Sequence, residues 1–199
     1  MGALLGMAAH LESKGCTVLD QAGLAQKFGP VNTHVRIAAR QDDIYAVRIA
    51  AGEADLLIGC DLVVAAGEDA LAKLNEKVSH AVINEHEAAT AEFTRNPDAQ
   101  VPGPAMRQAL IDAVGAEKTW FVDATNLATR LLGDSIATNL FMLGYAYQKG
   151  LVPLSAQAID KAIELNNVAV EFNQQAFLWG RRAASVSYTH LTLPTTPYV

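Results

Sequence analysis

The sequence is poor in cysteine and has no long uninterrupted apolar run. Only Cys16 and Cys60 are present among 199 residues, and no Cys-x-x-Cys pair occurs. This excludes a local iron–sulfur or zinc-ribbon motif and fits a reducing, cytoplasmic setting. No apolar stretch reaches the roughly 18 residues of a membrane helix without a polar break, and the first residues lack the basic start of a signal peptide. We therefore expect a cytoplasmic protein with no membrane association.

Clustered positive charge is also scarce. The chain has 15 Lys and Arg against 21 Asp and Glu, for a net charge of −6, and the basic residues are scattered singly apart from Arg181 and Arg182. Nucleic acid is an unsuitable partner, because phosphate neutralisation needs clustered basic side chains. With 51% hydrophobic and 18% charged residues, the chain is typical of a globular domain with one well-filled core.

Short apolar runs alternate with helix-like segments along the chain. Strands are predicted at residues 16–20, 33–38, 55–60, 80–84 and 119–123. Helices are predicted at residues 2–14, 62–66, 68–74, 104–114, 125–132, 136–149, 156–165 and 168–182, with part of 44–52 also helical. The expected N-caps are Asp61, Asp123, Asp134 or Ser135, and Ser155, and the glycines expected at helix C-termini include Gly15 and Gly133. This order indicates an α/β fold: a mainly parallel sheet with flanking helices and a helical C-terminal layer.

The last residues do not follow this pattern. Residues 185–199 contain no Asp, Glu, Lys or Arg, several threonines and two prolines, and they resemble translated adapter sequence. We expect one domain over residues 1–184 and a non-native tail over 185–199, which we exclude from the interpretation of the fold.

The polar loop after the first predicted strand is the main candidate binding segment. Glycines allow backbone N–H groups to approach an anion, and a lysine ammonium is suited to phosphate. Loops held by a rigid sheet are also where binding residues concentrate. A solvated lysine on a turn is the alternative. The candidate residues are Gly23, Gln26, Lys27 and Gly29.

Two further groups are weaker candidates. His34 and Arg36 share one face of a predicted strand, which lines either a subunit contact or the substrate cavity, or is an ordinary exposed polar face. Asn139 lies inside an apolar helix, where a buried amide needs partners, and is a candidate for contact with substrate or at an interface. A metal site at residues 85–87, with His80 nearby, is disfavoured because no later His or Cys completes a ligand set. No metal site is therefore predicted.

Several blocks of the sequence resemble a known family. In order, the blocks are Gly-Leu-Ala-Gln-Lys-x-Gly at 23–29 with Thr-His-Val-Arg at 33–36, the run at 53–61, Gly-Asp-Ser-Ile-Ala-Thr-Asn-Leu-Phe-Met-Leu-Gly-Tyr-Ala at 133–146, and Phe-Leu-Trp-Gly-Arg-Arg-Ala at 177–183. Together they resemble the γ-type domain of the 2-oxoacid:ferredoxin oxidoreductases, and are most similar to the fused indolepyruvate:ferredoxin oxidoreductases.

The resemblance implies a function for the whole assembly. Such an enzyme oxidatively decarboxylates an aryl 2-oxoacid such as indolepyruvate to an acyl-coenzyme A and passes electrons to ferredoxin. Thiamine diphosphate, magnesium and iron–sulfur clusters would lie on partner domains or subunits, so the chain alone is expected to bind no cofactor and to be inactive. For Gly23, Gln26 and Lys27 the resemblance implies a role in coenzyme A binding or active-site access.

Two alternatives remain open from the sequence. The chain is either a non-catalytic structural or interaction subunit of such a complex, or a stand-alone nucleotide-binding α/β protein. In the family, a strand and a glycine-rich turn precede the first helix, and neither occurs before residue 2. We therefore expect that the sequence is truncated at its N-terminus.

Overall fold

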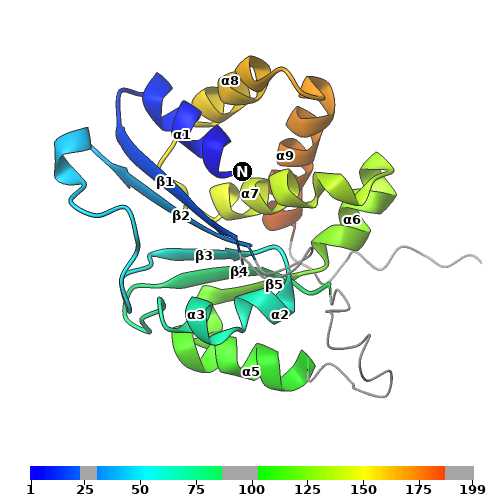
Figure 1. Cartoon of the computed structure of the whole chain (residues 1–199). Helices are drawn as coiled ribbons and strands as arrows, with labels where there is room; N and C mark the ends of the chain where they lie inside the picture. Colours follow the sequence, from blue (N-terminus) through cyan, green and yellow to red (C-terminus); the bar gives the residue numbers. More distant parts are fainter. Residues whose placement is uncertain (23–30, 87–102, 187–199) are drawn as a thin grey trace, which may run out of the picture.

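The computed structural model describes residues 1–22, 31–86 and 103–186 (Figure 1). Helices and strands alternate along most of the chain, and helices alone form its last part. In chain order the elements are α1 (Gly2–Leu11), β1 (Gly15–Ala22), β2 (Val31–Ala38), η1 (Gln41–Asp43), β3 (Leu56–Gly59), α2 (Leu62–Ala65), α3 (Glu68–Leu71), β4 (His80–Asn84), α5 (Gly103–Val114), η2 (Ala116–Lys118), β5 (Thr119–Val122), α6 (Ala124–Leu132), η3 (Ser135–Ala137), α7 (Thr138–Gln148), α8 (Ala156–Asn166) and α9 (Val170–Ser185).

The described strands form two sheets. β1 and β2 pair antiparallel as a hairpin, and β3, β4 and β5 form a parallel sheet in that order. The parallel sheet and its flanking helices confirm the predicted fold class. The strands on either side of residues 23–30 are likewise confirmed. They pair antiparallel because a short connection can join only antiparallel neighbours, and they form a separate two-stranded sheet.

Helices cover both faces of the parallel sheet (Figure 1). Side chains of the central strand β4 point to alternate faces. Ala81 and Ile83 pack with α2 and α5, whereas Val82 packs with Phe141 and Met142 of α7. Ala81, Val82 and Ile83 are all 0% exposed. A strand covered on both faces must be apolar throughout, which explains why this run carries no polar alternation.

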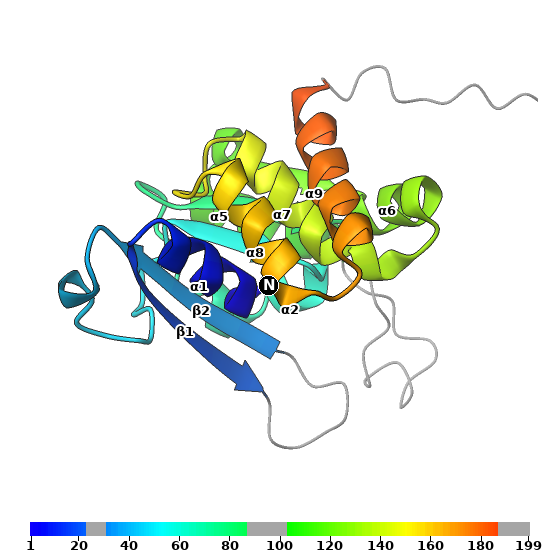
Figure 2. The same ribbon diagram turned by 90° about the horizontal axis from the view of Figure 1, so that it is seen from above.

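The helical layer depends on close contact between α7 and α9, which cross one another in both views (Figures 1 and 2). Gly144 of α7 faces the backbone of Phe177, and Gly180 of α9 faces the backbone of Phe141. A Cβ atom at either glycine would overlap a carbonyl group of the opposite helix. The two helices therefore approach at backbone distance only because both positions lack a side chain.

A second core joins α1 and α8 to the hairpin. Leu5 and Ala9 of α1 pack with Ile159 and Ile163 of α8, and Val35 of β2 packs against this cluster. The hairpin is therefore covered on one side by α1 and α8, two helices that lie far apart in sequence (Figure 2).

Several predicted helix ends are confirmed by their hydrogen bonds. Asp61 accepts from the Val64 N–H at 3.0 Å, Asp134 from Ile136 at 2.9 Å and Ser155 from Ala158 at 3.1 Å. Gly133 ends α6 in the left-handed conformation, at φ 84°. These short-range signals were readable because cap and helix are adjacent in sequence.

Two local predictions are wrong. No helix forms in residues 44–52, because this segment is held by long-range bonds instead, from Gly52 N–H to the Ala72 carbonyl and from Ala54 N–H to the Lys73 carbonyl. Gly15 is not a helix cap. It lies in β1, where a Cβ atom would overlap the backbone carbonyl of Arg40.

Among the described residues, no helix combines the length and apolar character needed to cross a membrane. α9 ends at Ser185, and residues 187–199 of the predicted tail lie outside the described part of the chain.

Replacing Gly144 with Ala is expected to lower the free energy of unfolding by about 2–3 kcal/mol, because α7 and α9 must separate to admit the methyl group. Urea denaturation followed by circular dichroism measures this change. Gly6→Ala is the matched control: Gly6 is also helical, but its Cβ would meet only an ordinary contact with Val18 at 3.5 Å. That variant should be neutral or up to about 1 kcal/mol more stable, and equal losses in both would contradict the packing argument.

Candidate functional site

The predicted binding loop joins the two strands of the hairpin. β1 and β2 are paired along their full length, from Gly15 opposite Ala38 to Ala22 opposite Val31. The described structure therefore supplies a rigid base on both sides of residues 23–30. The four predicted residues of the loop lie outside the described part of the chain: Gly23, Gln26, Lys27 and Gly29.

His34 lies in β2, one of the two strands of this base, and is only 6% exposed. Its Nδ1 accepts a hydrogen bond from the Ile49 N–H at 3.1 Å, and its Nε2 lies 3.0 Å from Oε1 of Gln21. Because Nδ1 is the acceptor, Nε2 must carry the proton and donate to Gln21. The neutral imidazole thus joins β2 to β1 on one side and to residue 49 on the other.

The surroundings of His34 keep it neutral. Burial lowers the pKa of the imidazole, and the positive charges of Arg48, Lys73 and Arg36 lower it further. A proton on Nδ1 would also place two donors face to face, at the ring nitrogen and the Ile49 N–H. His34 is therefore a structural hydrogen-bonding group at neutral pH.

Arg36 lies two residues along the same strand face, as predicted. Its guanidinium donates to the Glu53 carboxylate at 2.7 Å and to the Arg48 carbonyl at 3.0 Å. The pKa of Glu53 is lowered, mainly because its carboxylate accepts this hydrogen bond from Arg36. Both side chains are partly exposed, at 29% and 52%, so this ion pair positions the chain more than it stabilises it.

The face shared by His34 and Arg36 is covered by the connector, which we define as residues 39–55 between β2 and β3. The expectation of an ordinary exposed polar face is wrong at His34, since the connector itself supplies the groups that bury it. A role of His34 and Arg36 toward substrate or a partner stays a prediction.

Asn139 is exposed on the first turn of α7. The expectation of a buried amide there is wrong, because the helical period turns its side chain away from the core. The buried face of this helix carries its neighbour Thr138, together with Phe141 and Met142. A role of Asn139 at an interface stays a prediction.

Asn84 is the buried amide that the sequence reasoning missed. It ends β4 and is 1% exposed. Its Nδ2 donates to the Cys60 carbonyl at 2.9 Å and to the Thr125 hydroxyl at 2.8 Å. Its Oδ1 accepts from the N–H groups of Ala124 at 3.0 Å and Thr125 at 3.3 Å. One side chain thus connects the ends of all three parallel strands and caps α6.

This capping corrects the prediction for Asp123. Its side chain makes no capping hydrogen bond to the helix backbone; its carboxylate accepts from the Asn126 side chain at 2.7 Å instead. The readable signal for Asn84 was an amide ending an otherwise apolar strand, but its partners Cys60, Ala124 and Thr125 lie 24 to 41 residues away in sequence.

The strand ends meet at what we call the carboxyl edge, the edge formed by the last residues of β3, β4 and β5. In open α/β sheets this is the usual location of ligand sites. Here Glu85 accepts from Arg107 at 2.6 Å, and the Arg107 guanidinium lies 4.2 Å from the centre of the Phe121 ring. Burial raises the pKa of the Cys60 thiol to about 11, so this thiol is un-ionised and a poor nucleophile at neutral pH.

No group of three or more His, Cys, Asp and Glu residues in the described ranges could hold a metal ion. His86 follows the carboxyl edge, but its neighbour Glu87 lies outside those ranges.

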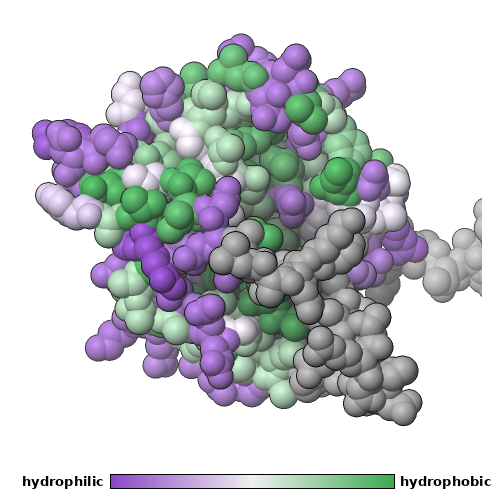
Figure 3. Space-filling model, in the orientation of Figure 1, coloured by the Kyte–Doolittle hydropathy of each residue, from purple (hydrophilic) through white to green (hydrophobic). Residues whose placement is uncertain are grey.

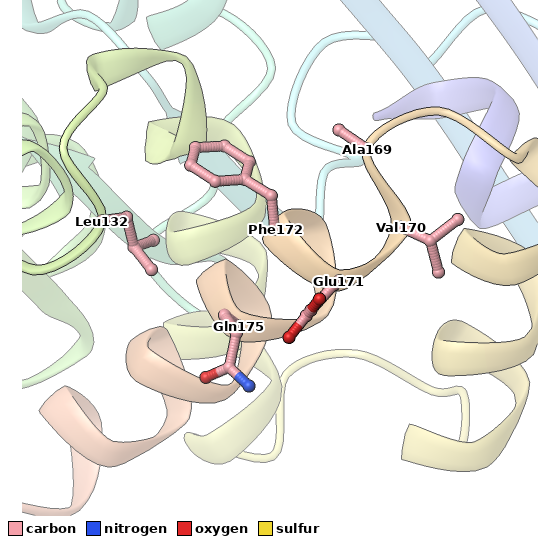
Figure 4. Close-up of a pocket in the computed structure, with 6 residues that line it drawn as sticks. All are labelled: Leu132, Ala169, Val170, Glu171, Phe172 and Gln175. Atoms are coloured by element: carbon pink, nitrogen blue, oxygen red, sulfur yellow. The ribbon is translucent and has the colours of Figure 1, made fainter.

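A surface depression of about 500 Å³ lies between the end of α6 and the start of α9 (Figure 4). In the close-up, Leu132 and Phe172 come from the two helices, while Glu171 and Gln175 extend along α9. Glu171 is its only charged lining residue among the described part of the chain. Its described lining residues include no acid–base pair and no nucleophile.

Residues 1–183 match the sequence model of the family described as pyruvate ferredoxin/flavodoxin oxidoreductase. Among curated proteins, none matches this chain.

Solved structures share the fold. A keto/oxoacid ferredoxin oxidoreductase γ subunit from Geobacter sulfurreducens superimposes with a TM-score of 0.59 at 18% identity, over 92% of this chain and 89% of that one. Subunit PORC of pyruvate oxidoreductase from Thermotoga maritima gives 0.60 at 20% identity, over 91% and 86%. A 2-oxoglutarate:ferredoxin oxidoreductase from Magnetococcus marinus, with 2-oxoglutarate, coenzyme A and succinyl-CoA bound, gives 0.63 at 13%, over 92% of this chain but 28% of that one.

Asn84→Ala is expected to destabilise the chain by about 2–4 kcal/mol, because it leaves the buried Ala124 N–H and the Cys60 carbonyl without their partner. Chemical denaturation measures the loss. Asn126→Ala removes an exposed amide from the first turn of the same helix and should change stability by less than about 0.5 kcal/mol. Similar losses in both variants would show that Asn84 does not hold the carboxyl edge.

Stability should depend on pH through His34. Its folded pKa is lowered while the unfolded chain keeps the ordinary value, so the unfolded state takes up a proton first and stability falls as the pH drops below about 6.5. His34→Asn keeps an acceptor for the Ile49 N–H but cannot titrate. Melting temperatures between about pH 5 and 8 should therefore fall less steeply for the variant, and parallel curves would refute the assignment.

Proposed function

Because the chain belongs to the pyruvate ferredoxin/flavodoxin oxidoreductase family, we propose that it is the γ-type domain of a 2-oxoacid:ferredoxin oxidoreductase. The observation that carries the proposal is the family match over residues 1–183, which spans nearly all of the described elements. In the proposed reaction, a 2-oxoacid and the coenzyme A thiol yield an acyl-coenzyme A, carbon dioxide and a proton. Two electrons pass to two oxidised ferredoxins.

The hard chemistry belongs to cofactors on partner domains or subunits: thiamine diphosphate with magnesium for decarboxylation, and iron–sulfur clusters for electron transfer. This chain shapes the shared cavity and binds its neighbours, and by itself it is inactive. Ferredoxin is the proposed final electron acceptor, and the assembly is cytoplasmic.

The substrate we propose is an aryl 2-oxoacid such as indolepyruvate. The support is the resemblance of the sequence blocks at 23–36, 133–146 and 177–183 to the indolepyruvate enzymes. Turnover of the assembled enzyme with indolepyruvate, pyruvate and 2-oxoglutarate tests this, since kcat/KM should be highest for the aryl compound. A higher value for either aliphatic substrate would overturn the aryl assignment and leave the broader one in place.

The loop at residues 23–30 is proposed to face coenzyme A. Two features of the described structure support this role. The hairpin is paired to its last described residues, Ala22 and Val31, and the buried His34 bonds to Gln21 one residue before the end of β1. A firmly held base limits the positions that the loop can adopt. Such a limit favours binding, because the loop side chains must contact the ligand in one defined geometry. Gly23 and Gly29 would give the backbone room near the anion, and Gln26 and Lys27 would contact it.

Lys27→Ala in the assembled enzyme should raise the KM for coenzyme A about tenfold, because a phosphate contact of the ligand is lost. Gln26→Ala should act in the same direction with a smaller effect. Steady-state kinetics with varied coenzyme A measure both.

Lys161→Ala is the matched control, since Lys161 is exposed on α8 and bonded to Glu164; its kinetics should be unchanged. If Lys27→Ala and Gln26→Ala also leave KM and kcat unchanged, the chain serves only as a structural subunit.

A further inference from the structure

The connector leaves the body of the protein after β2 and returns to it at β3. Its residues 39–48 are all exposed except Ile44, and Tyr45 is 94% exposed. Figures 1 and 2 both show this part projecting from the far end of the hairpin. In the space-filling view it stands out on the left, with hydrophilic side chains at its outer end (Figure 3). Because these residues bury little apolar surface, the position of the connector depends on hydrogen bonds.

One face of β2 supplies three of these hydrogen bonds. His34 accepts the Ile49 N–H at 3.1 Å, and Arg36 donates to the Arg48 carbonyl at 3.0 Å and to the Glu53 carboxylate at 2.7 Å. Of these three bonds, only the one to His34 depends on a side chain of the type that changes its charge between about pH 5 and 8. The attachment of the connector to the hairpin is therefore sensitive to the protonation of one imidazole.

A second proton on His34 is incompatible with its bond to the connector. Nε2 already carries the proton that it donates to Oε1 of Gln21 at 3.0 Å. The added proton must therefore go to Nδ1, where it would oppose the Ile49 N–H that this nitrogen accepts at 3.1 Å. The bond from His34 to β1 can persist in the charged ring, whereas the bond to the connector must break.

The surroundings of the imidazole also oppose this proton. Burial lowers the pKa of the ring, and the positive charges of Arg48 in the connector, Lys73 after α3 and Arg36 on the same strand lower it further. β1 contributes the neutral Gln21, and the carboxylate of Glu53 is bonded to Arg36. Release of the connector removes both the burial and the nearby charge of Arg48, so the released state takes up the proton more readily.

We propose that His34 and Ile49 form an acid-sensitive latch, which holds the connector on the hairpin at neutral pH and releases it when Nδ1 is protonated. This inference goes beyond the proposed function and does not depend on it. The release is local, because the contact between α7 and α9 and the hydrogen bonds of Asn84 involve neither the hairpin nor the connector. Ile49 is only half-buried, so its release uncovers little apolar surface.

Amide hydrogen exchange at Ile49, followed by NMR on the full chain, tests the latch. Its protection factor, corrected for the intrinsic exchange rate, should fall about threefold to tenfold between about pH 7.5 and 5.5, because protonation then favours the released state. Near-UV circular dichroism of Trp120 in β5 and Trp179 in α9 should stay constant over the same range. Unchanged protection, or a loss that accompanies a change in the tryptophan signals, would overturn the proposal.

Variants assign the effect to His34. His34→Asn keeps an acceptor for the Ile49 N–H but cannot titrate, so its protection should be nearly constant over this range.

A second variant keeps the test valid if His34→Asn does not fold. Arg48→Ala retains the backbone carbonyl that Arg36 contacts but removes a positive charge that opposes the proton in the latched state, so the fall in protection should be smaller than in the wild type. Arg130→Ala is the matched control, since Arg130 is an exposed arginine of α6, and it should match the wild type. The same pH dependence in His34→Asn and the wild type, or in Arg48→Ala and Arg130→Ala, would overturn the latch.

Discussion

One buried amide holds the parallel sheet to the helices that follow it. Asn84 ends the central strand, binds the Cys60 carbonyl beyond the first strand and caps the helix that begins beyond the third. An amide can do this because it has both donors and acceptors, so a single side chain satisfies backbone groups of opposite polarity. The Thr125 hydroxyl it contacts lies 3.5 Å from that of Thr138, the first residue of α7. This contact links the carboxyl edge to the start of the helical layer.

Buried or partly buried side chains also fix the hairpin to a neighbouring segment. His34 and Arg36 bind backbone groups of residues 48 and 49, so the hairpin and the connector are fixed to one another by side chains of a single strand face. The loop at residues 23–30 extends from one end of this unit, and the connector leaves it at the other. The chain thus concentrates its structural polar groups where two solvent-facing segments must be held in defined positions.

Much of this architecture was readable from local sequence. The strand at residues 80–84 was predicted with its observed bounds, and caps such as Asp61 and Ser155 were identified because cap and helix are adjacent. Other predictions failed where the deciding partner was remote. Asn84 was overlooked because its bonds reach across 40 residues, and the connector was assigned partly to helix because its bonds to Ala72 and Lys73 leave no local pattern.

The sequence by itself determined the alternation of strands and helices, the family and the polar character of the loop at residues 23–30, since each depends on neighbouring residues or on the order of motifs. Only the tertiary structure decided that His34 is buried and Asn139 is not, and that Tyr45 is fully presented to solvent. Exposure depends on which distant segments pack over a residue, and packing between remote segments has no signature in the spacing of residues along the chain.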